Sequence, residues 1–259
     1  MARIIAVANQ KGGVGKTTTS VNLVSALADM NYRTLLIDLD PQGNASVGCG
    51  VNARELEISA LDVLQDNADI SEAKIHLDQL GFDVLPSNSD LTAAEISLLQ
   101  VDEREYRLKN ALEKFAHQYA WVVIDCPPSL NMLTLNALTA ANSVLIPMQC
   151  EYYALEGLAS LLETIEQVRS SVNPGLEIEG LLRTMYDSRN NLSGAVSEQL
   201  IEHFGERVYR TIVPRNVTVA EAPSYGLPVL RYAPASKGAL AYLGLAGEML
   251  RRNRKRQAG

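Results

Sequence analysis

The sequence predicts a single α/β domain, 1–259, in which a mostly parallel, twisted sheet carries helices on both faces. Short apolar runs of strand type alternate with helical patterns along most of the chain, and the links between them are short. One of these patterns, at 4–19, places a glycine-bearing loop between a strand and a helix. A chain of 259 residues has the length of one ordinary α/β domain, and no linker divides it.

The stretch 4–19, IIAVANQKGGVGKTTT, predicts a strand, a phosphate-binding loop and the start of a helix. Because glycine lacks a Cβ, the loop backbone can take positive φ angles and turn successive N–H groups toward a phosphate chain. The unpaired N–H groups at the helix start favour the same anion. Lys16 is expected to reach the β and γ phosphates, and the Thr17 hydroxyl to ligand Mg²⁺. The candidate nucleotide ligands of this stretch are Lys11, Gly12, Gly13, Val14, Gly15, Lys16, Thr17 and Thr18.

A second buried strand follows the first predicted helix, 21–30, and ends in the sequence DLDPQGN. This strand, 34–38, places Asp38 and Asp40 at its carboxyl end, where open parallel sheets bind ligands. An ordinary turn rich in Asp, Pro and Gly would explain either aspartate alone. Beside a phosphate loop, both are candidates for a magnesium ion and its water shell.

A further strand, 121–125, carries four apolar residues and ends in Asp125 within the sequence WVVIDCPPS. This is the Walker B type of strand, in which the terminal aspartate holds Mg²⁺ through water. Pro127 and Pro128 stop the strand and stiffen the loop that follows. Asp125 therefore joins Thr17 and Asp38 as a candidate direct ligand of magnesium.

The other predicted elements continue the alternation of strands and helices, with a weaker, turn-rich segment at 46–79. Further strands are predicted at 82–86, 143–148, 179–185 and 208–213. Helices are predicted at 59–65, 91–99, 104–116, 132–141, in a segment ending at 168, at 194–204 and at about 236–251.

Composition narrows the class of protein. The hydrophobic share of 47% is enough for a sizeable core, and no run of about 18 apolar residues predicts a membrane span. The N-terminal MARII leads directly into a strand, so we expect no signal peptide and a cytoplasmic protein. Cys49, Cys126 and Cys150 are too widely spaced for a disulfide framework or a zinc site, and we expect buried thiols.

Charge is distributed unevenly along the chain. The formal net charge is −7, yet 251–259 carries five basic groups and no acid. A charged terminal run is more often solvated than bound, so we expect a basic C-terminal tail there. Because the chain as a whole is acidic, any contact with nucleic acid must come from a local basic patch.

The phosphate loop departs from the general pattern in an informative way. Gln10 stands where that pattern has its first glycine, and Lys11 begins the loop KGGVGKTT. This form resembles the deviant Walker A box of the ParA/MinD class of ATPases. The segments LLIDLDPQGN, VVIDCPPSL, ALTAANSVLIPMQCEYYALEGL and PRNVTVAEAPSYGLPV follow in the order and spacing of the ParA/Soj chromosome and plasmid partitioning ATPases, and together they tile most of the chain.

The resemblance implies a P-loop NTPase fold and a Mg²⁺-dependent ATPase that is slow without its partner. It implies a homodimer with ATP between the subunits, which binds double-stranded DNA without sequence preference. A ParB-type partner would release the DNA by stimulating hydrolysis, and the protein would be nucleoid-associated. Of the implied catalytic residues, Lys11 would contact the nucleotide of the other subunit, Lys16 the phosphates of its own, and Asp40 would orient the attacking water.

The resemblance also assigns residues outside the loop. Glu151 resembles a residue at the nucleotide and dimer interface. Pro214, Arg215 and Asn216, in the sequence PRN, resemble the loop on the adenine side of the nucleotide.

For DNA, Arg189 resembles a DNA-contacting arginine of Soj proteins, although a solvated loop arginine is the simpler interpretation. Thr218 stands where some relatives have a basic residue. We therefore expect DNA affinity to depend on Arg189, Arg215, Lys237 and the basic terminus. Contacts to phosphates would make the binding independent of sequence and steeply dependent on salt.

Two other interpretations of the loop stay open. A MinD-like ATPase would attach to a membrane through a C-terminal amphipathic helix. Here that end has Leu245, Met249 and Leu250 and then only basic and polar residues, so we expect its apolar side to pack on the sheet and no membrane attachment.

The second alternative is an iron-sulfur reductase of the nitrogenase iron-protein type, which shares the deviant loop. Such a protein needs cysteines that face each other across the dimer axis. Only Cys126 and Cys150 are candidates. Cys126 directly follows Asp125, which places it too close to the phosphates to be a cluster ligand.

Overall fold

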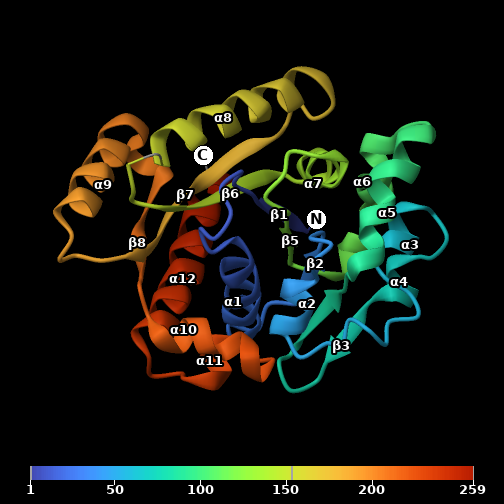
Figure 1. Ribbon diagram of the computed structural model, residues 1–259, viewed down its shortest axis with the longest axis horizontal. Helices are drawn as coiled ribbons and strands as arrows, with labels where there is room; N and C mark the ends of the chain where they lie inside the picture. The colour runs from blue at the N-terminus through green and yellow to red at the C-terminus, as the bar shows by residue number, and fades with distance from the viewer. Residues whose placement is uncertain (1, 153, 259) are drawn as a thin grey trace.

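Eight strands form one sheet in the order β3-β4-β2-β5-β1-β6-β7-β8, in a computed structural model that describes residues 2–152 and 154–258 (Figure 1). β3 pairs with β4 in the antiparallel sense, and the other neighbours are parallel. The strands are β1 (Arg3–Val7), β2 (Thr34–Asp38), β3 (Ile75–Leu77), β4 (Phe82–Leu85), β5 (Trp121–Asp125), β6 (Ser143–Gln149), β7 (Glu177–Tyr186) and β8 (Val208–Pro214).

Helices cover both faces of this sheet, which confirms the predicted fold class (Figure 1). One face carries α1 (Lys16–Asp29), α2 (Asn44–Gly48), α11 (Val229–Tyr232) and α12 (Lys237–Ala258). The other carries α3 (Ala60–Leu64), α4 (Ile70–Ala73), α5 (Thr92–Ser97), α6 (Arg107–Phe115), α7 (Met132–Ala140), α8 (Ala154–Ser171) and α9 (Asn191–Phe204). A short α10 (Val217–Glu221) follows β8.

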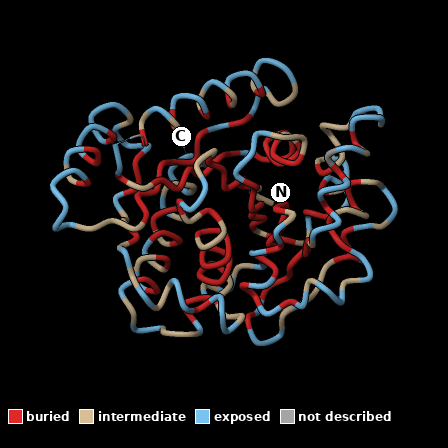
Figure 2. The backbone as a smooth tube through the Cα atoms, in the orientation of Figure 1, coloured by how far each residue is buried: buried red, intermediate tan, exposed pale blue. Residues whose placement is uncertain are grey.

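Alternation of side chains along the strands builds the two cores. In β1, Ile5 and Val7 point into the core under α1 and α12, whereas Ala6 belongs to the core on the opposite face. Strands buried on both faces read as continuous apolar runs, which is why the sequence alone predicts them. Figure 2 shows the buried residues gathered in the sheet and in α1, with exposed residues along the outer side of α8.

Strand register brings the ends of three strands together. Asp125, the last residue of β5, pairs with Val7 of β1 on one side and with Asp38 of β2 on the other. The loops that follow these strands therefore leave the sheet at the same height. This edge is where a parallel sheet binds ligands.

The C-terminus differs from the prediction. The last helix does not end at residue 251, because α12 continues to Ala258. Arg252 donates a 2.7 Å hydrogen bond to Glu248, and Arg256 donates one of 3.0 Å to Glu179. Carboxylates of the same domain thus pair with Arg252 and Arg256, while Arg251, Arg254 and Lys255 of the same helical run are exposed.

The apolar side of α12 is covered. Leu245 and Met249 are fully buried in the core beneath the helix, and Leu250 packs against it. Within 2–152 and 154–258, no helix has the length and apolar character needed to cross a membrane. Cys49, Cys126 and Cys150 are buried free thiols, as predicted.

Candidate functional site

A cleft of about 760 Å³ opens where β1, β2 and β5 end and α1 begins. Its volume lies within the range of small-molecule and cofactor sites. The loops after these strands supply most of its lining: Gly12, Gly13, Gly15, Lys16, Thr17, Thr18, Asp40, Pro41, Gln42, Asn44, Pro127, Pro128 and Ser129. The predicted phosphate loop therefore lines a real cleft, together with Asp40.

The phosphate loop is held in a conformation that only glycine adopts easily. Gly13 has a φ of +73° and Gly15, which directly precedes α1, has a φ of +86°. From β7, which lies beyond β6 in the sheet, the Thr184 hydroxyl donates a 2.7 Å hydrogen bond to the Val14 carbonyl. The Lys11 N–H already donates a 3.0 Å hydrogen bond to Asn9 Oδ1, so the donors available to an anion are the N–H groups of the glycine-bearing turn and of the first turn of α1.

Lys16 is buried at the start of α1, with 7% of its surface exposed. Its Nζ atom donates a 3.3 Å hydrogen bond to the Lys11 carbonyl. Burial lowers the pKa of the Lys16 ammonium, while the charge of Asp125 opposes that change. No carboxylate of the described residues forms an ion pair with Lys16, so its charge is free to meet a phosphate.

Asp125 is fully buried behind the loop. Its Oδ1 atom accepts a 2.8 Å hydrogen bond from the Ser20 hydroxyl, whereas its buried Oδ2 atom has no hydrogen-bond partner among the residues described. Burial raises the pKa of Asp125, the charge of Asp38 raises it further, and the nearby hydroxyls of Thr17 and Ser20 oppose the rise. A buried carboxylate oxygen without a protein donor, such as Asp125 Oδ2, fits a cation or a water bound to one.

Thr17 and Asp125 therefore fit a magnesium site. Across 2–152 and 154–258, no three His, Cys, Asp or Glu side chains gather closely enough to hold a metal ion by themselves. An ion at Thr17 and Asp125 would take most of its oxygen ligands from phosphate and water, which is the usual habit of Mg²⁺ at nucleotide sites.

Asp38, the second aspartate predicted to hold Mg²⁺, is surrounded by protein donors. It is fully buried and does not line the cleft. Its Oδ2 atom accepts hydrogen bonds from the Ser46 backbone N–H at 2.8 Å and the Ser46 hydroxyl at 2.7 Å, and Oδ1 accepts one from the Asp40 N–H at 3.1 Å. Since protein donors engage both oxygens, Asp38 organises the loop after β2, and its assignment to Mg²⁺ stays a prediction.

Asp40 lines the cleft with 9% of its surface exposed. One carboxylate oxygen accepts a 2.9 Å hydrogen bond from the Gln42 N–H. The other oxygen accepts no hydrogen bond from the residues that the structure describes. Asp40 is therefore the carboxylate best placed to bind a water in the cleft.

Lys11 lies outside the cleft lining and is held by Glu151. The Lys11 Nζ atom donates a 2.6 Å hydrogen bond to Glu151 Oε2, and the two side chains are 39% and 50% exposed. The two residues that the resemblance assigns to the subunit interface thus contact each other within one chain.

The sequence PRN does not line the cleft. Pro214 ends β8, the Arg215 N–H donates to the Tyr186 carbonyl at 3.1 Å, and Asn216 caps α10 by accepting from the Val219 N–H at 3.2 Å. The far wall is formed instead by Met185, Ala222, Pro223 and Leu227. Three of these belong to the segment AEAPSYGLP that follows PRN.

The three predicted DNA residues lie near one another at one edge of the sheet. The Arg189 side chain is 88% exposed and forms a two-point contact with Asp187, at 2.9 and 2.8 Å. Hydrogen bonds from Arg189 lower the pKa of Asp187 to about 2, and the charge of Arg215 lowers it as well. Lys237, at the start of α12, is exposed and precedes Gly238, which packs closely against α10.

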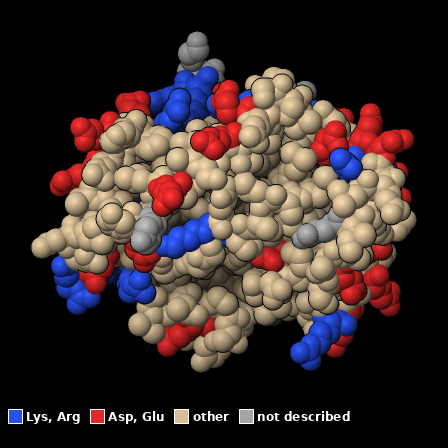
Figure 3. All heavy atoms as spheres, turned by 45° about the horizontal axis from the view of Figure 1, so that its top comes forward, with Lys and Arg blue, Asp and Glu red and all other residues tan. Residues whose placement is uncertain are grey.

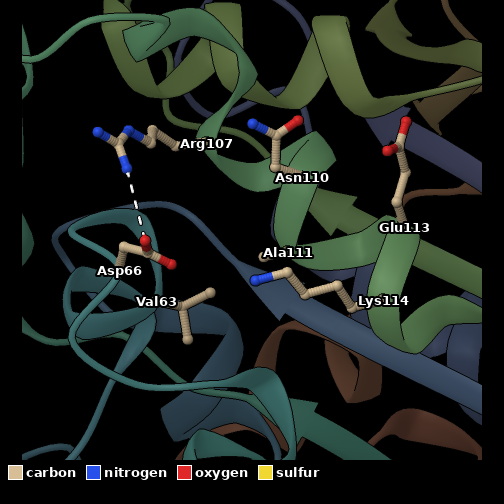
Figure 4. A pocket seen from close by; sticks show the side chains of 7 residues that line it. All are labelled: Val63, Asp66, Arg107, Asn110, Ala111, Glu113 and Lys114. Carbon is tan, nitrogen blue, oxygen red and sulfur yellow. Dashed lines mark ion pairs between the residues drawn. The ribbon is translucent and has the colours of Figure 1, made fainter.

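A second hollow, of about 480 Å³, lies between α6 and the end of α3. Figure 4 shows Arg107 facing Asp66, with 4.0 Å between the charged atoms, and Lys114 reaching into the hollow. Two acids and two bases line it, and no phosphate loop does. It is not a candidate for the nucleotide.

Comparisons with known proteins agree with this geometry. A family model described as an AAA domain matches residues 2–178. The chain is 52% identical over 258 residues to the chromosome partitioning protein ParA of Caulobacter vibrioides, covering 99% of this chain and 97% of that protein. It is 51% identical over 249 residues to the sporulation initiation inhibitor protein Soj of Bacillus subtilis, covering 96% and 98%.

A solved structure matches over the same extent. The cobyrinic acid a,c-diamide synthase of Mycobacterium smegmatis, crystallised with ADP and magnesium, is 40% identical and superposes with a TM-score of 0.86. The match covers 98% of this chain and 96% of that one.

Proposed function

Because this chain belongs to the ParA/Soj family of chromosome-partitioning ATPases, we propose that it binds ATP with Mg²⁺, hydrolyses it to ADP and phosphate, and moves DNA. One observation carries the proposal. The cleft combines a loop of phosphate-binding conformation and Lys16 with two carboxylates in different states, Asp40 exposed to the cleft and Asp125 buried behind it. These are the parts that phosphoryl transfer to water requires.

The loop binds the triphosphate through its backbone N–H groups and the start of α1, and Lys16 supplies a cation with no competing carboxylate. Thr17 and Asp125 would hold Mg²⁺, which would supply positive charge to the phosphate oxygens. Asp40 orients a water through the oxygen that has no protein donor. Positioning and electrostatics do most of the work in this type of reaction.

Dimerisation is proposed to place ATP between two subunits. Lys11 leaves Glu151 and contacts the phosphates of the other subunit, so a monomer lacks a cation that the site needs and turnover is slow. Figure 3 shows a broad area of surface with few charged side chains, beside a hollow that a Lys or Arg and some Asp or Glu side chains border. Such a face is typical of the core of an interface, where charged residues are depleted.

DNA binding is assigned to Arg189, Arg215 and Lys237. They lie at one edge of an otherwise acidic protein of net charge −7, which suits a local phosphate contact without base recognition. A ParB-type partner then stimulates hydrolysis and releases the DNA. The Caulobacter relative is named for chromosome partitioning and the Bacillus relative for sporulation, so the proposal names DNA segregation and no particular replicon.

Phosphate release tests the proposed reaction. Wild-type protein should release phosphate from ATP only with Mg²⁺, and faster when DNA and a ParB-type partner are both present. Lys16→Ala should bind no nucleotide and therefore release no phosphate. Lys114→Ala, which removes an exposed lysine from α6, should match the wild type. Absence of Mg²⁺-dependent release under all these conditions would reject the proposal.

A further inference from the structure

We propose that Ser46 and Ser87 are positioning residues for Asp40, a role that rests on the ATP hydrolysis proposed above. Neither residue lines the cleft, and both are fully buried. They hold the backbone of Asp40 through a closed ring of hydrogen bonds among Asp38, Asp40, Ser46 and Ser87. This ring joins the loops that follow β2 and β4.

The first half of the ring begins at Asp38. The Ser46 hydroxyl donates to Asp38 Oδ2 at 2.7 Å and accepts from the Ser87 N–H at 3.1 Å. The other oxygen of Asp38 accepts from the Asp40 N–H at 3.1 Å. Asp38 therefore fixes the N–H of Asp40 and, through Ser46, the backbone of Ser87.

The second half closes the ring. The Ser87 hydroxyl donates a 2.6 Å hydrogen bond to the Asp40 carbonyl. The N–H and the carbonyl of Asp40 are thus both occupied by buried partners, while its side chain remains available in the cleft. An oriented carboxylate needs this kind of support, since a displacement of about 1 Å can cost about 100-fold in rate.

Two backbone contacts brace the same ring. At Gly43, with a φ of +62°, any Cβ would lie 2.8 Å from the Ser87 carbonyl oxygen, so glycine lets the two loops touch. The Ala60 N–H, at the start of α3, donates a 2.8 Å hydrogen bond to the Pro86 carbonyl. The segment that carries Ser87 is therefore itself anchored and can act as a fixed support.

None of these bonds involves the phosphate loop. Among the described residues, the ring makes no hydrogen bond to Lys16 or to the N–H groups that would bind the phosphates. Its loss should therefore lower the rate of hydrolysis and leave ATP binding intact. A residue with a general structural role would affect both.

The experiment compares Ser87→Ala and Ser46→Ala with a matched control, Ser25→Ala. Ser25 is also fully buried, but its hydroxyl has no hydrogen-bond partner among the described residues. We expect kcat for ATP hydrolysis to fall about 10- to 100-fold in Ser87→Ala and Ser46→Ala. The Kd for ATP, measured by direct titration, should stay within about twofold of wild type, and Ser25→Ala should match the wild type in both quantities.

Wild-type kcat in Ser87→Ala, or an equal loss of kcat and ATP affinity, would overturn the positioning role. Should Ser87→Ala not fold, as judged by circular dichroism, Ser46→Ala decides the question alone, because it breaks the same ring at the other side. A wild-type protein without ATPase activity would instead reject the proposed function, so the two failures can be told apart.

Discussion

Lys11 and Glu151 form a 2.6 Å ion pair within one subunit, at the edge of the nucleotide cleft. The residues are 140 positions apart in sequence, and each lies in a loop at the carboxyl ends of the strands. The lysine that we assign to the nucleotide of a partner subunit is thus engaged before any dimer forms. Because both side chains are substantially exposed, the pair is worth at most about 1 kcal/mol.

Glu151→Gln should therefore favour the dimer modestly. The amide keeps the shape of the side chain but releases the ammonium of Lys11. We expect the Kd of the ATP-bound dimer to fall about two- to fivefold, as measured by analytical ultracentrifugation. Glu163→Gln, an exposed glutamate on α8, is the matched control and should leave that Kd unchanged. A weaker dimer would mean that Glu151 binds the nucleotide or the partner more than it restrains Lys11.

Asp125→Asn should stabilise the ligand-free protein and abolish Mg²⁺-dependent hydrolysis. Burial and the charge of Asp38 raise the pKa of Asp125, so its ionised form is costly in the folded state. The protonated form of Asp125 does not carry this cost. The wild type therefore has its full stability below the ordinary carboxyl pKa near 4 and loses stability as the pH rises through the raised pKa of Asp125. The gain in unfolding free energy, about 1–4 kcal/mol, should therefore be larger at pH 8 than at pH 5 in urea titrations.

An Asp125→Asn protein that is less stable than wild type at pH 8 would contradict this argument. It would indicate that the buried carboxylate is stabilised by partners other than those observed. Added Mg²⁺ and ATP should stabilise wild type more than the variant, because the cation loses a ligand while the loop and Lys16 remain.

The nucleotide loop and the strands beside it could be predicted from sequence because their signals are local. The glycines before α1 and the aspartates that end β2 and β5 occupy consecutive positions of recognisable patterns. Tertiary contacts then decide which of the buried aspartates keeps an oxygen without a protein donor. Asp38 and Asp125 end neighbouring strands in register, yet Asp38 is enclosed by Ser46, and the sequence alone does not show that difference.

Contacts between distant residues account for what could not be predicted. Ser87 and Asp40 are 47 positions apart, and no local pattern links them. The basic C-terminal run contains no acid, so its sequence predicts solvated side chains. Arg256 nevertheless pairs with Glu179, which lies 77 positions away in the sequence. The short α2, α10 and α11 lack the length for a helical periodicity and depend on packing.

Arg189→Glu should dimerise normally with ATP but bind DNA at least about tenfold more weakly. The side chain of Arg189 is exposed, and the substitution sets a second carboxylate beside that of Asp187 at the phosphate contact. Lys114→Glu makes the same change of charge on α6, which lies on the other side of the molecule in Figure 1, and should retain DNA binding. Co-sedimentation with DNA at several salt concentrations measures the effect, and the salt dependence of the remaining binding should be shallower.

Glu179 should set the acid stability of the C-terminal helix. Burial would raise the pKa of Glu179, but Arg3 and Arg256 outweigh it and hold the pKa below its ordinary value. The stabilisation that ionised Glu179 gives the folded protein is present above the ordinary glutamate pKa, and it is lost as the pH falls through the lowered pKa of Glu179. Glu179→Gln should cost about 3 kcal/mol of unfolding free energy at pH 7, and the difference from wild type should shrink toward pH 3.

Glu177→Gln is the control for this effect. Glu177 is 61% exposed and lies 3.6 Å from Arg256, so its loss should cost less than about 1 kcal/mol at any pH. Equal costs for the two variants would show that burial of Glu179 does not matter.

The oligomeric state of Asp40→Ala tests the central claim most directly, because this variant should bind ATP without consuming it. Light scattering after size exclusion should give twice the monomer mass with ATP and Mg²⁺, and the monomer mass with ADP and Mg²⁺. A variant saturated with ATP and Mg²⁺ that remains monomeric would contradict the account of an ATP-dependent dimer.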